Sequence, residues 1–126
     1  MYIRFVVTEV DAQSSRRRGV LVAAHQMVAS ERLDEETRAE VERLLRWFNK
    51  HLRIPSALGH SEHYRALSWF KPNARKPIDV MWQLTHLLRA SGVLVEVLKT
   101  NAPGSVLYED KWQLVAKPPK GKKLGW

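Results

Sequence analysis

Residues 2–10 read YIRFVVTEV, a stretch dominated by β-branched and aromatic side chains. Ile3, Phe5 and Val7 alternate with the polar Arg4 and Thr8. A period of two is typical of a strand with one buried face. We therefore predict a strand over residues 2–10, and we expect helices to cover the apolar face of its sheet.

Two longer segments have the period of helices. Residues 34–52 form one apolar stripe at helical spacing, made of Val41, Leu44, Leu45, Phe48 and Leu52. Asp34 can cap the start of this helix, and the acids that follow it suit the helix dipole. A second helix is predicted over residues 74–91, where Gly92 is suited to end it. A shorter apolar helix is predicted over residues 19–29.

The last third of the chain predicts three strands, over residues 93–99, 105–109 and 112–117. Residues 93–98 are apolar at nearly every position, which is typical of a central strand. Residues 66–70 are a short apolar run, and their period leaves strand and turn both open. The order of elements predicts an α+β fold: a mainly antiparallel sheet of about four strands with three helices covering one face.

A single domain accounts for the length of the chain, which has 126 residues. We assign residues 1–117 to one α+β domain. Residues 118–126 combine lysine, proline and glycine with no acid, so we expect a flexible basic tail there.

Charge is divided unevenly along the sequence. The net charge is +8, yet residues 31–42 hold six acids against two arginines. Residues 43–126 hold fifteen Lys and Arg against five acids. This distribution favours an anionic partner, either nucleic acid or an acidic protein.

Several classes of protein are disfavoured by composition. The chain has no cysteine, which excludes disulfides, thiolate metal sites and cysteine nucleophiles. No apolar run approaches the roughly 20 residues of a membrane-spanning helix, so we expect no membrane partner. The N-terminus lacks the pattern of a signal peptide, and we expect a cytoplasmic location.

The basic residues after Glu42 are interleaved with aromatic ones, a mixture suited to single-stranded nucleic acid. Arginine and lysine contact phosphates, and aromatic rings stack on unpaired bases. Cations near a helix C-terminus and Trp-Phe pairs in a core are the alternative interpretations. The predicted nucleic-acid-binding residues are Arg43, Arg46, Trp47, Lys50, Arg53, Trp69, Lys71, Arg75 and Lys76.

One cluster has the residue types of catalysis. His60, Glu62 and His63 could activate water in a metal-dependent hydrolase or nuclease. The cluster lacks a third ligand at a recognised spacing, and its order differs from the His-Glu-x-x-His motif. We therefore expect a polar surface loop, no resident metal or cofactor, and a protein that is not an enzyme.

An alternative function is that of a protein-interaction or regulatory subunit. Apolar residues cover more than half of the predicted helix over residues 78–90, and only Asp79, Gln83 and His86 form a polar stripe. Such a helix packs on more than one side or meets a second chain. A homodimer through this helix is therefore the competing prediction.

Several segments together resemble a group of small uncharacterised bacterial proteins. They are residues 1–6, 47–52, 68–71, 100–104, 107–110 and 113–116, of which the Tyr108-Glu109-Asp110 hairpin is the most specific. The resemblance extends over nearly all of the chain up to Pro118. It implies a bacterial, cytoplasmic protein, and it carries over no activity and no functional residue.

Overall fold

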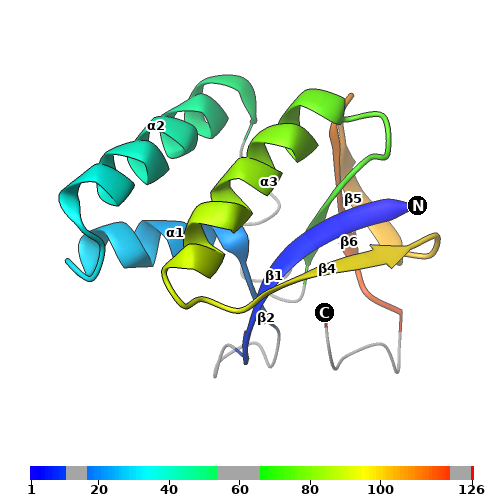
Figure 1. The fold of residues 1–126 in the computed structure, drawn as a ribbon. Coiled ribbons are helices and arrows are strands. Elements are labelled where there is room, and N and C mark those ends of the chain that lie inside the picture. The colour runs from blue at the N-terminus through cyan, green and yellow to red at the C-terminus, as the bar shows by residue number, and fades with distance from the viewer. Residues whose placement is uncertain (11–16, 54–65, 120–125) are drawn as a thin grey trace.

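The computed structural model describes residues 1–10, 17–53, 66–119 and 126. These residues form an α+β fold with three helices and an antiparallel sheet of six strands (Figure 1). The strands are β1 (Tyr2–Val10), β2 (Arg17–Gly19), β3 (Leu67–Phe70), β4 (Val95–Thr100), β5 (Ser105–Glu109) and β6 (Gln113–Lys117). The helices are α1 (Val20–Ala29), α2 (Glu35–His51) and α3 (Arg75–Ala90).

Strand β1 is the centre of the sheet, and it pairs with three other strands. Along one edge it pairs with β4 over its first six residues, from Tyr2 opposite Thr100 to Val7 opposite Val95. Its other edge is divided between two partners, because Ile3 lies opposite Phe70 of β3 whereas residues 6–10 pair with β2. The sheet continues from β3 through β6 to β5.

Arg4 lies where the second edge of β1 changes partner. Its guanidinium donates hydrogen bonds to the carbonyl oxygens of Arg17 in β2 (3.0 Å) and Ser68 in β3 (3.4 Å). A third bond reaches the carbonyl oxygen of Trp126 (3.2 Å). Buried carbonyl groups are costly without a partner. The side chain therefore bridges three backbone segments around the junction between β2 and β3.

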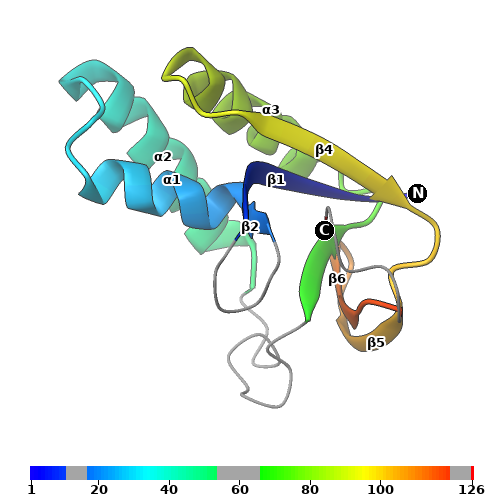
Figure 2. The ribbon, with the colours of Figure 1, turned by 90° about the horizontal axis from the view of Figure 1, so that it is seen from below.

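The three helices lie on one side of the sheet (Figure 2). The apolar stripe of α2 is buried as the sequence predicts, with Val41, Leu44, Leu45 and Phe48 all inside the core. Helices α1 and α3 join the same core, together with the apolar face of β1. A second, smaller core contains Trp69 and is partly covered by Trp126. The two tryptophan rings are packed edge to face, with their centroids 4.8 Å apart.

The predicted fold class is confirmed, and the count of about four strands is wrong. Strand β2 was not predicted, because three residues are too few to show a period. Residues 67–70 form strand β3. Strand β4 is not central among the described residues, since it pairs with β1 alone. Its apolar residues serve both faces instead: Val97 packs on the main core and Leu98 on the second core.

The division into a domain and a tail stays a prediction, because residues 120–125 lie outside the described part of the chain. The turn before β5 depends on Gly104, whose φ of 113° is a backbone conformation that favours glycine. A Cβ atom at this position would overlap the carbonyl group of Lys117 in β6. The turn and the end of β6 are therefore in close contact.

Two substitutions in α2 test which face of this helix is buried. Leu45 is 5% exposed, so Leu45→Ala should leave a cavity and lower the free energy of unfolding by about 2–5 kcal/mol. Arg46 is exposed, so Arg46→Ala should change it by less than about 0.5 kcal/mol. Urea denaturation of both variants measures the difference. A larger loss for Arg46→Ala would contradict the packing described above.

Candidate nucleic-acid interface

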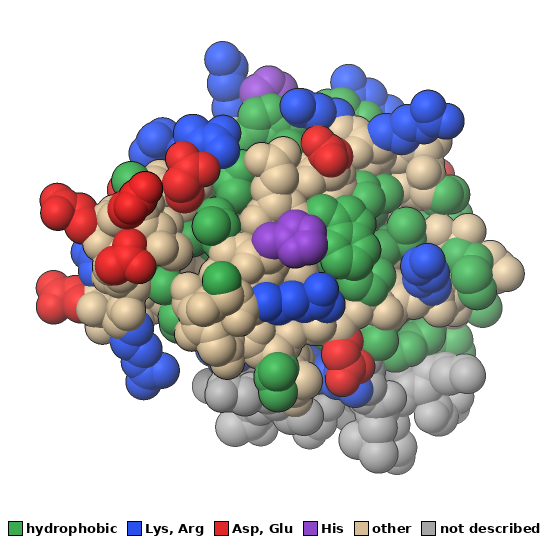
Figure 3. Space-filling model, in the orientation of Figure 1, with side chains coloured by type: hydrophobic (Ala, Val, Ile, Leu, Met, Phe, Trp, Pro, Cys, Tyr) green, Lys and Arg blue, Asp and Glu red, His purple; other side chains and the backbone are tan. Residues whose placement is uncertain are grey.

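Helix α2 has an acidic beginning and a basic end. Asp34 caps it, since one carboxylate oxygen accepts the backbone N–H of Thr37 (2.7 Å) and the other accepts its hydroxyl (2.9 Å). These two bonds lower the pKa of Asp34. Figure 3 shows most of the acidic side chains of this face gathered over the beginning of α2, and Lys and Arg side chains distributed over much of the face. The acidic segment of the sequence is thus also gathered in space.

Four predicted phosphate-binding residues lie in or just after the second half of α2. Arg46, Lys50 and Arg53 are exposed, and their charged groups have no hydrogen-bond or ion-pair partner among the described residues. Arg43 differs, because its guanidinium pairs with Glu40 at 3.0 Å. This contact raises the pKa of Arg43 and lowers the pKa of Glu40. Among the described residues, the exposed cations without such a partner in the second half of α2 and just after it are therefore Arg46, Lys50 and Arg53.

An aromatic column runs beside these cations. Trp47 is half-buried and stacks against His51 (4.5 Å between ring centroids, 20° between planes) and against Trp112 (6.3 Å, 25°). The ammonium group of Lys111 lies 4.3 Å from the ring centroid of Trp112. We call His51, Trp47, Trp112 and Lys111 the aromatic column. It joins α2 to the turn between β5 and β6.

The exposed aromatic surface of the column is not the one that the sequence indicates. Much of Trp47 is covered by its two stacked neighbours. His51 is exposed and has no second ring contact among the described residues, so one face of its imidazole is open. Its Nδ1 lies 2.9 Å from the carbonyl oxygen of Trp47, which fixes the orientation of the ring. The open stacking face therefore belongs to His51.

Trp69 does not belong to this surface. Its ring is 1% exposed and packs in the second core, so the structure removes it from the predicted interface. Trp112 takes the role that the sequence assigns to Trp69 as a second aromatic near the cations. The missed signal was its place in a hairpin turn, directly after Lys111, where side chains tend to be accessible.

The remaining predicted cations lie in the β3–α3 connection and at the start of α3. The backbone N–H of Lys71 donates to the carbonyl oxygen of Trp112 (2.8 Å), so the β3–α3 connection adjoins the column. The ammonium group of Lys71 is paired with Glu109 (2.5 Å). Arg75 and Lys76 are exposed in the first turn of α3, which contains no acid. Cations there add to the positive end of the helix dipole instead of compensating it.

The Tyr108-Glu109-Asp110 segment has a structural role beside this surface. The Asp110 carboxylate accepts the backbone N–H groups of Trp112 and Gln113 (both 2.9 Å), the Tyr108 hydroxyl (2.8 Å) and the Gln113 amide (3.2 Å). Burial raises the pKa of Asp110, but these bonds outweigh it and the pKa is lowered. The same bond from Tyr108 raises the pKa of that phenol.

Gln113 connects this turn to α2. The side chain is 2% exposed, and its amide also donates to the carbonyl oxygen of Arg53. The end of α2 is thereby held against the β5–β6 turn. The aromatic column depends on this connection, because Trp47 and Trp112 come from these two elements.

The other predicted sites receive less support. His60, Glu62 and His63 lie outside the described residues, and within the described ranges no three His, Asp or Glu side chains gather as metal ligands do. The large apolar residues of helix 78–90 are packed within the chain, except for Trp82 at 36% exposed. The excess apolar surface that motivates a homodimer is therefore small.

Comparison of the chain with protein-family models, with curated proteins and with solved structures finds no match. The resemblance to small bacterial proteins accordingly stays a prediction. In the described part of the chain, none of the helices has the length and apolar character required to cross a membrane.

Replacing Asp110 should weaken the β5–β6 turn in a pH-dependent way. Asp110→Asn puts an NH₂ group where two hydrogen-bond donors now point at a carboxylate oxygen. It should lower the free energy of unfolding by about 1–2 kcal/mol at neutral pH. Because the folded pKa is lowered, this stabilisation is present above about pH 4 and is lost as the pH falls through the folded pKa.

Urea denaturation at a series of pH values measures this effect. The difference in the free energy of unfolding between the wild-type protein and Asp110→Asn should become smaller below about pH 4. Asp79→Asn is the matched control, since that carboxylate is exposed and has no hydrogen-bond partner among the described residues. A difference of the same size at every pH would contradict the role given to Asp110.

Proposed function

We propose that this protein binds nucleic acid without catalysis, through the second half of α2, the β5–β6 turn and the start of α3. The observation that carries the proposal is a set of exposed cations, without an ion-pair partner among the described residues, in the elements that hold or adjoin the aromatic column. Arg46 and Lys50 lie on α2 and Arg53 follows it, while Arg75 and Lys76 lie at the start of α3. A cytoplasmic location is part of the same proposal.

Single-stranded nucleic acid is the form that fits this arrangement. Phosphates would contact the cations, and these contacts carry no sequence information. A base would stack on the open face of His51 and so lengthen the aromatic column by one ring. Paired bases are already stacked on each other and have no face to offer. Duplex is accordingly expected to bind more weakly, through phosphates alone.

Charge reversal on α2 tests the electrostatic half of the proposal. In fluorescence anisotropy with a labelled 12-nucleotide single strand, the affinity should fall as salt rises, because binding releases counterions. Arg46→Glu combined with Lys50→Glu should weaken binding by at least about tenfold. The matched control is Arg32→Glu with Lys99→Glu, two exposed cations outside this surface, for which we expect a loss below about threefold.

The stacking half of the proposal is tested with His51→Ala. This variant should lose affinity for the single strand and keep its weaker affinity for a duplex of the same length. His86→Ala is its control, because His86 is also exposed beside a tryptophan, Trp82, on α3. Equal losses in the two charge-reversed pairs, or a dissociation constant weaker than about 10⁻⁴ M, would overturn the proposal.

A further inference from the structure

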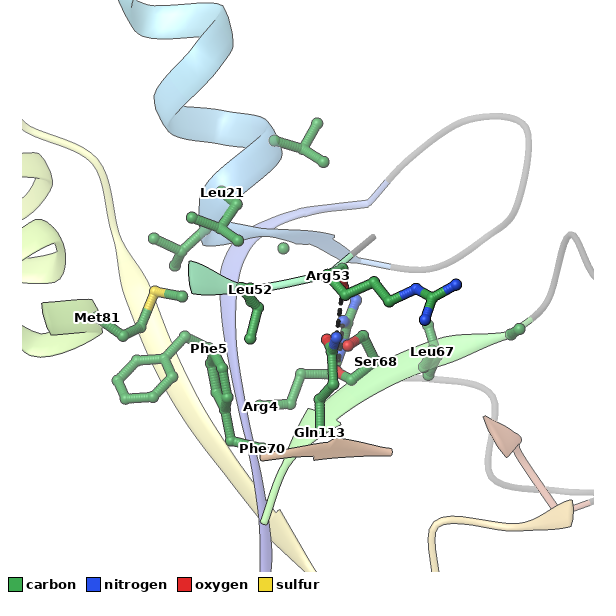
Figure 4. A pocket seen from close by; sticks show the side chains of 14 residues that line it. Arg4, Phe5, Leu21, Leu52, Arg53, Leu67, Ser68, Phe70, Met81 and Gln113 are labelled. Atoms are coloured by element: carbon green, nitrogen blue, oxygen red, sulfur yellow. Dashed lines mark hydrogen bonds between the residues drawn. The ribbon is translucent and has the colours of Figure 1, made fainter. Parts of the chain in front are cut away.

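A cavity of about 280 Å³ opens at the junction between β2 and β3. Among the described residues, no strand pairs with this edge of β1 between Ile3 and Val6, and the cavity lies beside this interval. The start of α1, the end of α2 and strand β3 form its walls (Figure 4). At roughly 30 Å³ for each group of the size of a water or methylene, it has room for about nine non-hydrogen atoms. That is the size of a small organic molecule.

The cavity has an apolar side and a polar side. Phe5, Phe70 and Met81 lie on one side of it, and Arg4, Ser68 and Gln113 on the other (Figure 4). Pockets that bind small molecules combine apolar walls with a few convergent polar groups in this manner. An apolar body with one polar end is the ligand shape that this division accommodates.

The charge of the polar side is positive. The Arg4 guanidinium is partly buried there, and it donates to the backbone carbonyl groups of Arg17 and Ser68. Arg53 also lines the cavity, and its guanidinium has no hydrogen-bond or ion-pair partner among the described residues. Gln113 adds no charge, since its amide is used by Arg53 and Asp110.

The start of α1 adds to this positive potential. Residues 19–22 line the cavity, no side chain of the described residues caps the helix, and its first turn contains no acid. N–H groups at such an end carry a partial positive charge. Two arginines and a helix end thus favour an anion at the polar side, while the aromatic side excludes a fully hydrated one.

We propose that this cavity binds a small organic carboxylate with an apolar body of eight to ten non-hydrogen atoms, counting the carboxylate. The carboxylate lies between Arg53 and the start of α1, within the field of Arg4. The apolar body lies against Phe5, Phe70 and Met81. This site is separate from the proposed nucleic-acid interface, apart from the shared residue Arg53.

Gly19 offers a way to fill the polar side of the cavity. Its φ of −67° and ψ of 157° suit any residue, and an added Cβ would lie 3.8 Å from a nitrogen of the Arg4 guanidinium. Gly19→Val therefore places a side chain where the carboxylate would be. Ala29→Val, at the exposed other end of α1, is the matched control. Arg53→Gln removes one charge from an exposed position and is not expected to affect folding.

The experiment is a titration of ¹⁵N-labelled protein with octanoate and, separately, with octan-1-ol, followed by backbone amide shifts. Octanoate should shift residues 19–22 and Ser68, and octan-1-ol should bind at least about tenfold more weakly. Gly19→Val should abolish these shifts, Ala29→Val should retain them, and Arg53→Gln should reduce the preference for the acid. Equal binding of acid and alcohol, undiminished binding by Gly19→Val, or no shift at these residues would overturn the proposal.

Discussion

The architecture depends on the division of one edge of β1 between two partners. A strand normally keeps one neighbour along an edge, but β1 pairs with β3 at Ile3 and with β2 from Val6 onward. The Arg4 side chain donates to a carbonyl group of each. The junction opens the sheet enough to leave the cavity beside Gly19 and still satisfies polar groups that would otherwise be costly to bury.

A second polar connection fixes the surface on which the proposed function depends. Asp110 orders the β5–β6 turn, and Gln113 joins that turn to the carbonyl group of Arg53 at the end of α2. Trp47 and Trp112 are brought together by these bonds, although 64 positions separate them in the chain. The segment from Tyr108 to Asp110 thus has a structural role in the turn.

In both places the residues proposed to bind a ligand adjoin a hydrogen-bonded network without being part of it. The Gln113 amide N–H groups are used within its network, whereas Arg46, Lys50 and Arg53 have no ion-pair partner among the described residues. Cations without a partner among the described residues are available to an external anion, although holding each long side chain in place costs conformational entropy. The same reasoning supports the proposed interface and the proposed cavity ligand, which differ in size and in the apolar surface that they require.

The sequence by itself determined the elements whose periods are long enough to recognise: β1, the buried stripe of α2, α3 and the strands after it. It also determined that cations follow acids along α2, because this is the order of the residues. Their spacing puts the cations on one face of the helix. Only the tertiary structure decided that β4 pairs with β1 alone among the described strands, that Trp69 is buried, and that Trp112 joins Trp47. The cavity and the role of Arg4 likewise depend on segments far apart in sequence. Such contacts come from the packing of distant elements, which local periodicity does not encode.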